Sequence, residues 1–188
     1  GGTMPSDWHF RTLGESTEMS AGGDKPKILS SIQTEKCTYP VYSNGLSDEG
    51  LYGYTDAPKI KDESVTVSAR GTIGFVCLRH IPYVPIVRLV TLIPLRKLMS
   101  AKYLYLYLKQ CDISGTGTTQ QQLTVPDFRK TEILIPSKDV MDQFTKTVTP
   151  LFDTIWSNQE QNRKLASLRD ILLPKLMSGE LNVSDIQL

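Results

Sequence analysis

The sequence predicts an α+β protein with one globular domain, built on a mixed or antiparallel β core, and a long C-terminal coiled-coil helix. Three observations predict this fold. Strand-like runs fill much of the chain between residues 38 and 93, and a helical hydrophobic period replaces them at 97–111. From residue 151 onward, apolar residues recur at alternating spacings of four and three, which is the coiled-coil period.

The length of 188 residues fits one globular domain of roughly 130–150 residues followed by that helix. We assign residues 4–136 to the domain and residues 137–179 to the helix. Residues 1–3, the GGT before Met4, resemble a tag remnant and are left out of the fold prediction.

The first β segments lie between residues 38 and 78. Residues 38–56 contain one short strand, a turn at Asn44-Gly45 and four tyrosines. Apolar and polar residues alternate over 65–69, as in a half-buried strand. The triplet Arg70-Gly71-Thr72 then leads, through a very tight connection, into the apolar run 73–78.

The second half of the domain mixes the two periods. Residues 83–93 form a further β run, in which Pro85 restricts the first part to a sheet edge or a strand start. Residues 97–111 form an amphipathic helix that Ser100 is placed to cap. A short strand at 131–136 leads into the terminal helix.

The terminal helix carries one apolar seam, and Gly179 ends it in the position that glycine prefers. Such a seam can cover the protein's own core or a partner helix. The two seam asparagines favour a partner helix, because a buried amide tends to fix the register between chains. The predicted helix-pairing residues are Ile155, Asn158, Asn162, Leu165, Leu168, Leu172 and Leu176.

Charge along this helix predicts how two copies pair. Residues 151–161 carry a net charge of −2, and residues 162–175 carry +3. An antiparallel pair sets the acidic half of one helix beside the basic half of the other and opposes the two helix dipoles. We therefore expect an antiparallel homodimer of the isolated chain.

Composition limits the possible functions. The net charge of +1 provides no overall field for nucleic acid, so any such contact needs a local patch. Three cysteines without a CxxC pair and two histidines argue against a zinc site. Free thiols suit a reducing cytosol. No apolar run approaches the roughly 18 residues of a membrane span.

Catalytic motifs are equally scarce. The sequence has no GxSxG, HExxH or phosphate-binding loop, and no adenine-methyltransferase signature. The acidic pairs Asp48-Glu49 and Asp62-Glu63 are isolated from each other rather than clustered as metal ligands. The domain is interpreted as a binding module, and no catalytic or metal-ligating residue is predicted.

Five segments in a fixed order resemble a known family. They are YPVYSNG (39–45), SARGTIGFV (68–76), YLYLYL (103–108), GTTQQQLTVPDFRKTEILIP (117–136) and LRDILLPKLMSGEL (168–181). Together they resemble the DNA-specificity subunit of type I restriction–modification systems. That resemblance implies two target-recognition domains, each followed by a spacer helix. This chain has one of each, and its ending resembles the second half of the subunit.

The family resemblance also implies a function and partners. The chain is expected to recognise one half of a bipartite double-stranded DNA target and to catalyse nothing itself. Methyltransferase subunits and motor-nuclease subunits would bind the specificity subunit. S-adenosylmethionine, ATP and magnesium would belong to those partners, so we expect no cofactor on this chain. The expected location is the cytoplasm of a bacterium or archaeon.

The DNA-contacting residues follow from chemistry. Reading base edges needs directional donors and acceptors, and the candidates are Tyr42, Ser43, Asn44, Ser68, Arg70, Thr72, Thr118, Thr119, Gln120 and Gln121. The phosphate-contacting candidates are Lys36, Lys59, Lys61, Arg129 and Lys130. Each has a structural alternative: the 70–72 triplet can be only a turn, the Thr/Gln run only a polar loop, and the lysines only solvated.

A protein-interaction adaptor that dimerises through the terminal helix, without any DNA role, is the alternative function. Salt-dependent and sequence-selective binding to duplex DNA would separate the two functions. An enzyme would need a pocket with converging titratable groups, which the sequence does not indicate.

Overall fold

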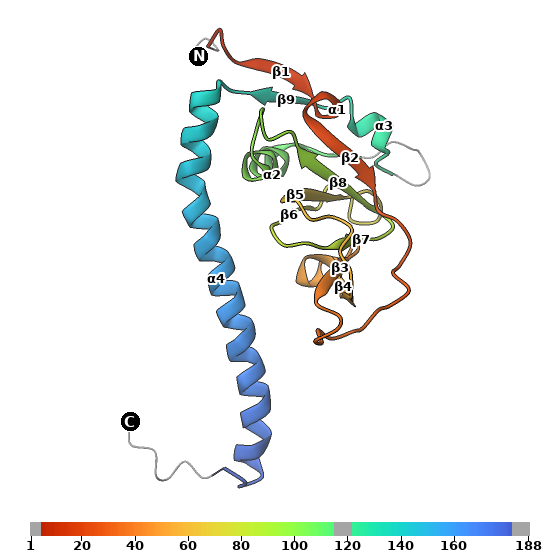
Figure 1. The fold of residues 1–188 in the computed structure, drawn as a ribbon, viewed down its shortest axis with the longest axis vertical. Helices are drawn as coiled ribbons and strands as arrows, with labels where there is room; N and C mark the ends of the chain where they lie inside the picture. Colours follow the sequence, from red (N-terminus) through yellow and green to blue (C-terminus); the bar gives the residue numbers. More distant parts are fainter. Residues whose placement is uncertain (1–4, 115–121, 182–188) are drawn as a thin grey trace. The chain divides into compact units, whose positions relative to one another are not determined.

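A computed structural model describes residues 5–114 and 122–181, and the predicted tag remnant lies outside them. The chain divides into two compact units, Gly1–Thr145 and Lys146–Leu188. The elements are β1 (His9–Thr12), α1 (Leu13–Ser16), β2 (Thr17–Ala21), β3 (Tyr39–Tyr42), η1 (Ser47–Gly50), β4 (Leu51–Thr55), β5 (Ser64–Ser68), β6 (Val76–Arg79), β7 (Val84–Pro85), β8 (Leu89–Pro94), α2 (Ala101–Gln110), α3 (Val125–Phe128), β9 (Glu132–Ile135) and α4 (Lys138–Met177) (Figure 1).

The main sheet of the first unit has the strand order β2-β8-β5-β6 and is antiparallel throughout. Val65 of β5 pairs with Leu78 and Leu92 on its neighbouring strands, so the three apolar side chains share one face. Helix α2 packs on β5, β6 and β8. Its Leu104 and Leu108 are fully buried. The predicted helix at 97–111 is therefore confirmed in a shorter form.

Ser100 caps α2 as predicted, because its side chain accepts a hydrogen bond from the Tyr103 backbone N–H. The strand predicted at 131–136 is also confirmed, as β9. It pairs with β1, a strand that the sequence analysis did not predict. Strand β2 was missed as well, because its TEMSA sequence has little strand preference.

The strand predicted at 65–69 is confirmed as β5, but the prediction that it is half-buried is wrong. The period of two is correct, but all five residues of β5 are buried. The polar side of the strand faces protein: the hydroxyls of Ser64 and Tyr83 lie 2.9 Å apart, and Arg79 Nε donates to Thr66 Oγ1 at 3.0 Å. An alternating pattern identifies two faces of a strand but not what covers the second face.

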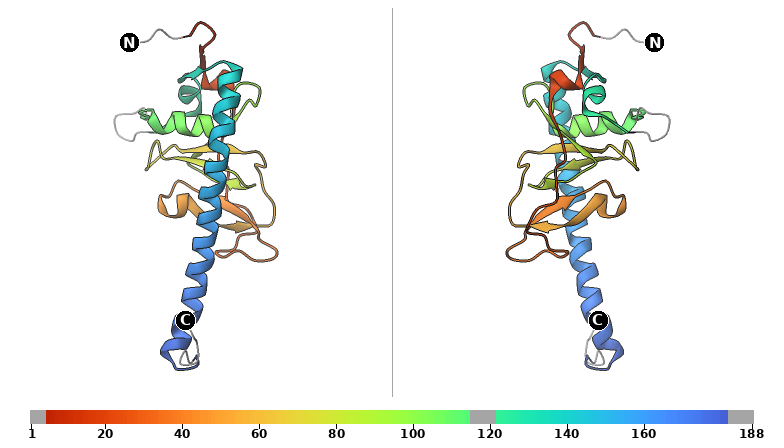
Figure 2. Two further views of the ribbon diagram at one scale, coloured as in Figure 1. Left: turned by 90° about the vertical axis from the view of Figure 1, so that its left-hand side faces the viewer. Right: turned by 90° about the vertical axis from the view of Figure 1, so that its right-hand side faces the viewer.

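The smaller sheet, of order β4-β3-β7, lies on that polar side, so the main sheet stands between it and α2 in Figures 1 and 2. β7 pairs in parallel with β3 and holds Pro85 at the sheet edge, as predicted. The prediction of a single strand in 38–56 is wrong, because β4 pairs with β3. β4 was not predicted because it contains Gly53, and glycine disfavours a strand. The Ser30 carbonyl oxygen lies 2.6 Å from the position of the absent Cβ of Gly53, so only glycine fits there.

Helix α4 is a single element that begins within the first unit. There Met141 is buried, and the rings of Tyr103 and Phe144 pack edge to face with centroids 5.5 Å apart. The α+β class with a long C-terminal helix is confirmed. Among the described residues, no helix is both long and apolar enough to cross a membrane.

In the second unit, α4 runs to Met177 and Gly179 follows at φ 75°. The Leu181 N–H closes the end by donating to the Lys175 carbonyl at 3.1 Å, as in a glycine-terminated helix. The predicted pairing residues are exposed except for Leu172, which is half-buried; Leu165 is 63% exposed and Leu168 50%. Their pairing stays a prediction.

Candidate nucleic-acid interface

Two of the predicted DNA-contacting segments are joined in the structure, although they lie far apart in the sequence. Asn44, in the loop after β3, donates through Nδ2 to the Arg70 carbonyl at 2.7 Å. Thr72 Oγ1 returns a hydrogen bond to the Asn44 carbonyl at 2.6 Å. Gly71 between them has φ 79°, which glycine adopts without strain. We call Asn44, Arg70, Gly71 and Thr72 the turn surface.

Described residues on either side of the third predicted segment contact the same hairpin. Thr118, Thr119, Gln120 and Gln121 lie outside the described residues, but the chain on both sides of them is placed. The Leu123 N–H donates to the Ala69 carbonyl at 2.8 Å. On the other side, the Ile113 carbonyl oxygen lies 2.9 Å from the absent Cβ of Gly74. Both flanks of the Thr/Gln run therefore meet the β5–β6 hairpin.

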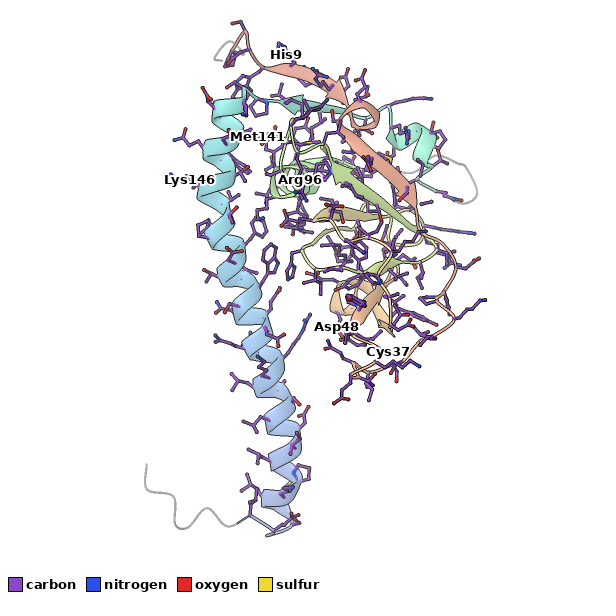
Figure 3. All side chains as sticks on the ribbon, viewed as in Figure 1. His9, Cys37, Asp48, Arg96, Met141 and Lys146 are labelled. Carbon is purple, nitrogen blue, oxygen red and sulfur yellow. The ribbon has the colours of Figure 1, made fainter. Side chains whose placement is uncertain are left out.

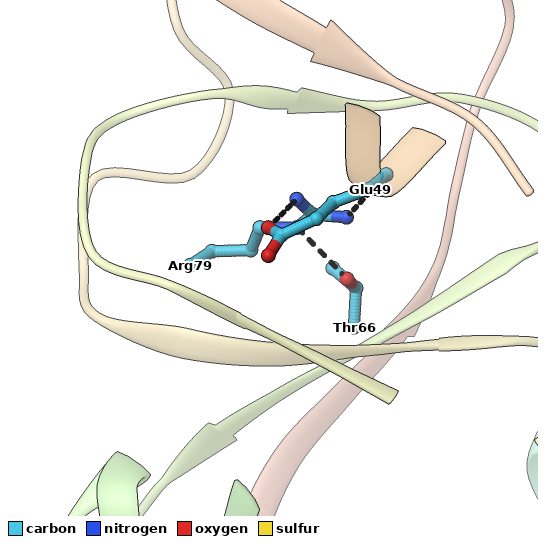
Figure 4. Close-up of polar contacts among 3 residues, drawn as sticks. All are labelled: Glu49, Thr66 and Arg79. Carbon is cyan, nitrogen blue, oxygen red and sulfur yellow. Dashed lines mark hydrogen bonds and ion pairs between the residues drawn. The ribbon is translucent and has the colours of Figure 1, made fainter. Parts of the chain in front are cut away.

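A buried arginine supports the loop that carries Asn44. The η1 residues Asp48, Glu49 and Gly50 have φ values of 46°, 54° and 84°, an unfavourable conformation for the two non-glycine residues. Arg79, 3% exposed, holds this turn: its Nη2 donates to the Glu49 carbonyl at 2.6 Å (Figure 4). The Arg79 guanidinium also lies 3.6 Å from the centroid of the Tyr42 ring.

Arg79 is not among the residues predicted from the sequence. An arginine at the end of the buried run Val76–Arg79 was the available signal, since arginine is rarely buried without partners. Its partners also show what Tyr42 does in this fold. The Tyr42 ring contacts both the Arg79 guanidinium and the Tyr83 ring, whose centroid is 5.8 Å away, so Tyr42 has a structural role.

One further candidate has limited access to a ligand. Ser68 is 1% exposed in β5 and cannot reach a base edge in this conformation. Ser43 is half-buried, as are Asn44, Arg70 and Thr72, and its backbone N–H donates to the Gly50 carbonyl at 2.8 Å. The candidate base-reading set from the described residues is therefore reduced to Ser43, Asn44, Arg70 and Thr72.

The phosphate-contacting candidates are all exposed. Their contacts with the rest of the protein differ from residue to residue. Lys130 forms an ion pair with Asp127 at 3.5 Å, and Arg129 donates to the Met19 carbonyl at 3.4 Å, both beside α3. Lys59 Nζ lies 3.3 Å from the position of the absent Cβ of Gly23. For Lys36 and Lys61 the structure gives exposure alone.

The described residues contain no group of three or more His, Cys, Asp or Glu side chains that could hold a metal ion. Cys77 is buried, and burial raises the pKa of its thiol to about 11, so the thiolate needed for nucleophilic attack is scarce near neutral pH. The described residues of the turn surface offer hydrogen-bonding groups on two turns that are bonded to each other.

The α+β domain presents polar groups on two turns that are hydrogen-bonded to each other. It is followed by a long helix with an exposed apolar seam. These are features of a recognition module. The chain belongs to the family of type I restriction modification DNA specificity domains, whose family model matches residues 5–167. This membership confirms the predicted family and the prediction of a specificity component rather than a catalytic one.

Relatives in that family include the specificity subunit of the type I restriction enzyme HindI of Haemophilus influenzae, which is 30% identical over 178 residues. That match covers 91% of this chain and 38% of the relative. The specificity subunit of the type I restriction enzyme MjaIX of Methanocaldococcus jannaschii is 36% identical over 95 residues, covering 47% of this chain and 22% of the relative.

The fold is similar to the crystal structure of the type I restriction-modification S subunit from M. genitalium. The TM-score is 0.69 at 23% identity, over 91% of this chain and 46% of that one. The chain spans about two fifths of the length of the curated relatives it matches.

Proposed function

We propose that this chain recognises one half of a bipartite DNA sequence, as a target-recognition domain with its spacer helix. The observation that carries the proposal is the joining of two polar segments that lie far apart in the sequence, the loop after β3 and the turn of the β5–β6 hairpin. Asn44 donates to the Arg70 carbonyl, and Thr72 donates to the Asn44 carbonyl. Base reading needs such groups on a rigid support.

Asn44 of the turn surface retains hydrogen-bonding groups for a ligand. Asn44 uses one of its two amide hydrogens on the Arg70 carbonyl, which leaves the other hydrogen and Oδ1 to pair with an adenine edge. A guanidinium such as that of Arg70 can donate two parallel hydrogen bonds to guanine O6 and N7. The hairpin therefore offers groups that suit both purines.

Partners follow from the family. We propose that the chain acts with methyltransferase subunits and, through them, with motor-nuclease subunits, in the cytoplasm of a bacterium or archaeon. S-adenosylmethionine, ATP and magnesium would serve those partners. In this arrangement the chain determines which DNA sequence is bound, and the exposed seam of α4 provides a surface for pairing with another helix.

Binding to duplex DNA should depend steeply on salt. If about 4–6 phosphates are contacted, log K should fall against log salt concentration with a slope of about −4 to −5. Fluorescence anisotropy with duplexes selected from a randomised pool measures both the slope and the sequence preference. A chain that binds no duplex at low salt would instead fit the adaptor function.

The substitution Arg70→Ala should reduce discrimination at one base pair, costing ~1–3 kcal/mol on the selected duplex and much less on random DNA. Lys130→Ala is the control for a phosphate contact and should weaken binding to both duplexes about equally. Equal losses for Arg70→Ala would instead place Arg70 among the phosphate contacts. Thermal unfolding of both variants checks that the hairpin is intact.

A further inference from the structure

Arg88 occupies a backbone position that normally belongs to glycine. It is the third residue of the turn Ile86–Leu89, which is closed by a hydrogen bond from the Leu89 N–H to the Ile86 carbonyl at 3.4 Å. Its φ of 75°, after a Val87 that has no positive φ, gives the signs of a type II turn. Glycine is strongly preferred at this position, because a side chain there is strained.

This turn adjoins the turn surface. The Ala69 N–H, next to Arg70, donates to the Arg88 carbonyl at 2.8 Å. Ser68 and Leu89 are paired between β5 and β8, so the two turns emerge at the same sheet end. Two arginines from separate turns thus flank one backbone hydrogen bond.

The side chain of Arg88 is exposed and makes no hydrogen bond, ion pair or ring contact with the part of the chain that the structure describes. Nothing in the described fold therefore explains why a strained position carries arginine. Such positions are often kept where a side chain contacts a ligand. The adjacent groups already define the ligand as duplex DNA under the proposed function.

We propose that Arg88 is a second DNA-contacting arginine, placed beside Arg70 to donate its guanidinium to a guanine edge of the same half-site. The inference rests on the proposed function and adds a residue and a turn to it. Its positive φ sets the direction in which the Cα–Cβ bond leaves the turn, and the planar guanidinium can then donate two parallel hydrogen bonds to a guanine edge, which a lysine cannot do.

The substitution Arg88→Gly tests this inference, because glycine suits the backbone but removes the guanidinium. We expect the urea midpoint of unfolding to stay at or above that of the unsubstituted chain. Affinity for the selected duplex should fall roughly tenfold or more, with a smaller loss on random DNA. Arg88→Lys keeps the charge and should lose most of the same discrimination.

Arg96→Gly is the matched control, since it removes an exposed arginine beyond the other end of β8, roughly 20 Å away at 3.4 Å per strand residue. Figure 3 shows Arg96 beside α2. It shows Asp48, which follows the Asn44 loop in the sequence, near β3 and β4 and away from Arg96. If Arg88→Gly and Arg96→Gly lower affinity equally, or Arg88→Gly leaves it unchanged, the inference is overturned. If the unsubstituted chain binds no DNA, the proposed function itself fails.

Discussion

Replacing Arg79 with alanine should lower the free energy of unfolding by about 3 kcal/mol, a large fraction of the stability of an ordinary domain. The guanidinium donates to the Glu49 carbonyl at 2.6 Å and to Thr66 Oγ1 at 3.0 Å. Alanine leaves both acceptors without their donor on the covered face of the main sheet. It also removes the cation from the Tyr42 ring, a contact worth about 0.5–2 kcal/mol.

The control for Arg79→Ala is Glu49→Gln. The Glu49 side chain is 56% exposed and its carboxylate lies 3.4 Å from Arg79 Nη1, so this ion pair should contribute less than about 1 kcal/mol. The stronger contact uses the Glu49 carbonyl, which glutamine keeps. Urea unfolding followed by tryptophan fluorescence compares the two variants. Similar losses for both would mean that the ion pair, rather than the backbone contact, holds η1 in place.

The buried arginine also shows why the fold could be predicted only in part. The apolar side of β5, with Val65 and Val67, follows from local periodicity, as does the face of α2. The covering of the polar side depends on Arg79 of β6 and on Tyr83, which precedes β7, and both lie elsewhere in the sequence. Period identifies faces, but tertiary contacts decide whether a polar face meets water or protein.

The candidate site could likewise be predicted only in part. Residue types in 42–44, 70–72 and 118–121 indicated groups able to read bases, because Asn, Arg and Gln match purine edges. The meeting of the first two segments depends on hydrogen bonds such as that between Thr72 and Asn44, which sequence spacing does not reveal. Arg88 was missed for a related reason: its positive φ is a property of the folded turn, and no glycine marked that turn in the sequence.

Self-association of the isolated chain is the other large effect, and two seam substitutions should abolish it. Leu165 and Leu168 are exposed on α4, and full burial of such a side chain is worth about 1.5–3 kcal/mol. In an antiparallel dimer each substituted leucine is lost from both copies. Leu165→Lys with Leu168→Lys should therefore convert a dimer at tens of micromolar into a monomer, as measured by multi-angle light scattering.

The control carries the same two added charges away from the seam. At about 100° per residue, Ser157 and Ser167 each project roughly 100° or more away from the neighbouring seam residues, and both are exposed. Ser157→Lys with Ser167→Lys should leave the dimer intact. Orientation is tested separately by a cysteine introduced at Asn162, near the expected two-fold axis, in a chain whose native cysteines are replaced by serine. An antiparallel pair brings Asn162 of the two copies together and allows a disulfide, whereas cysteine at Ile155 should remain reduced. A monomeric unsubstituted chain would refute the pairing, and a disulfide that forms equally well at both positions would indicate parallel helices.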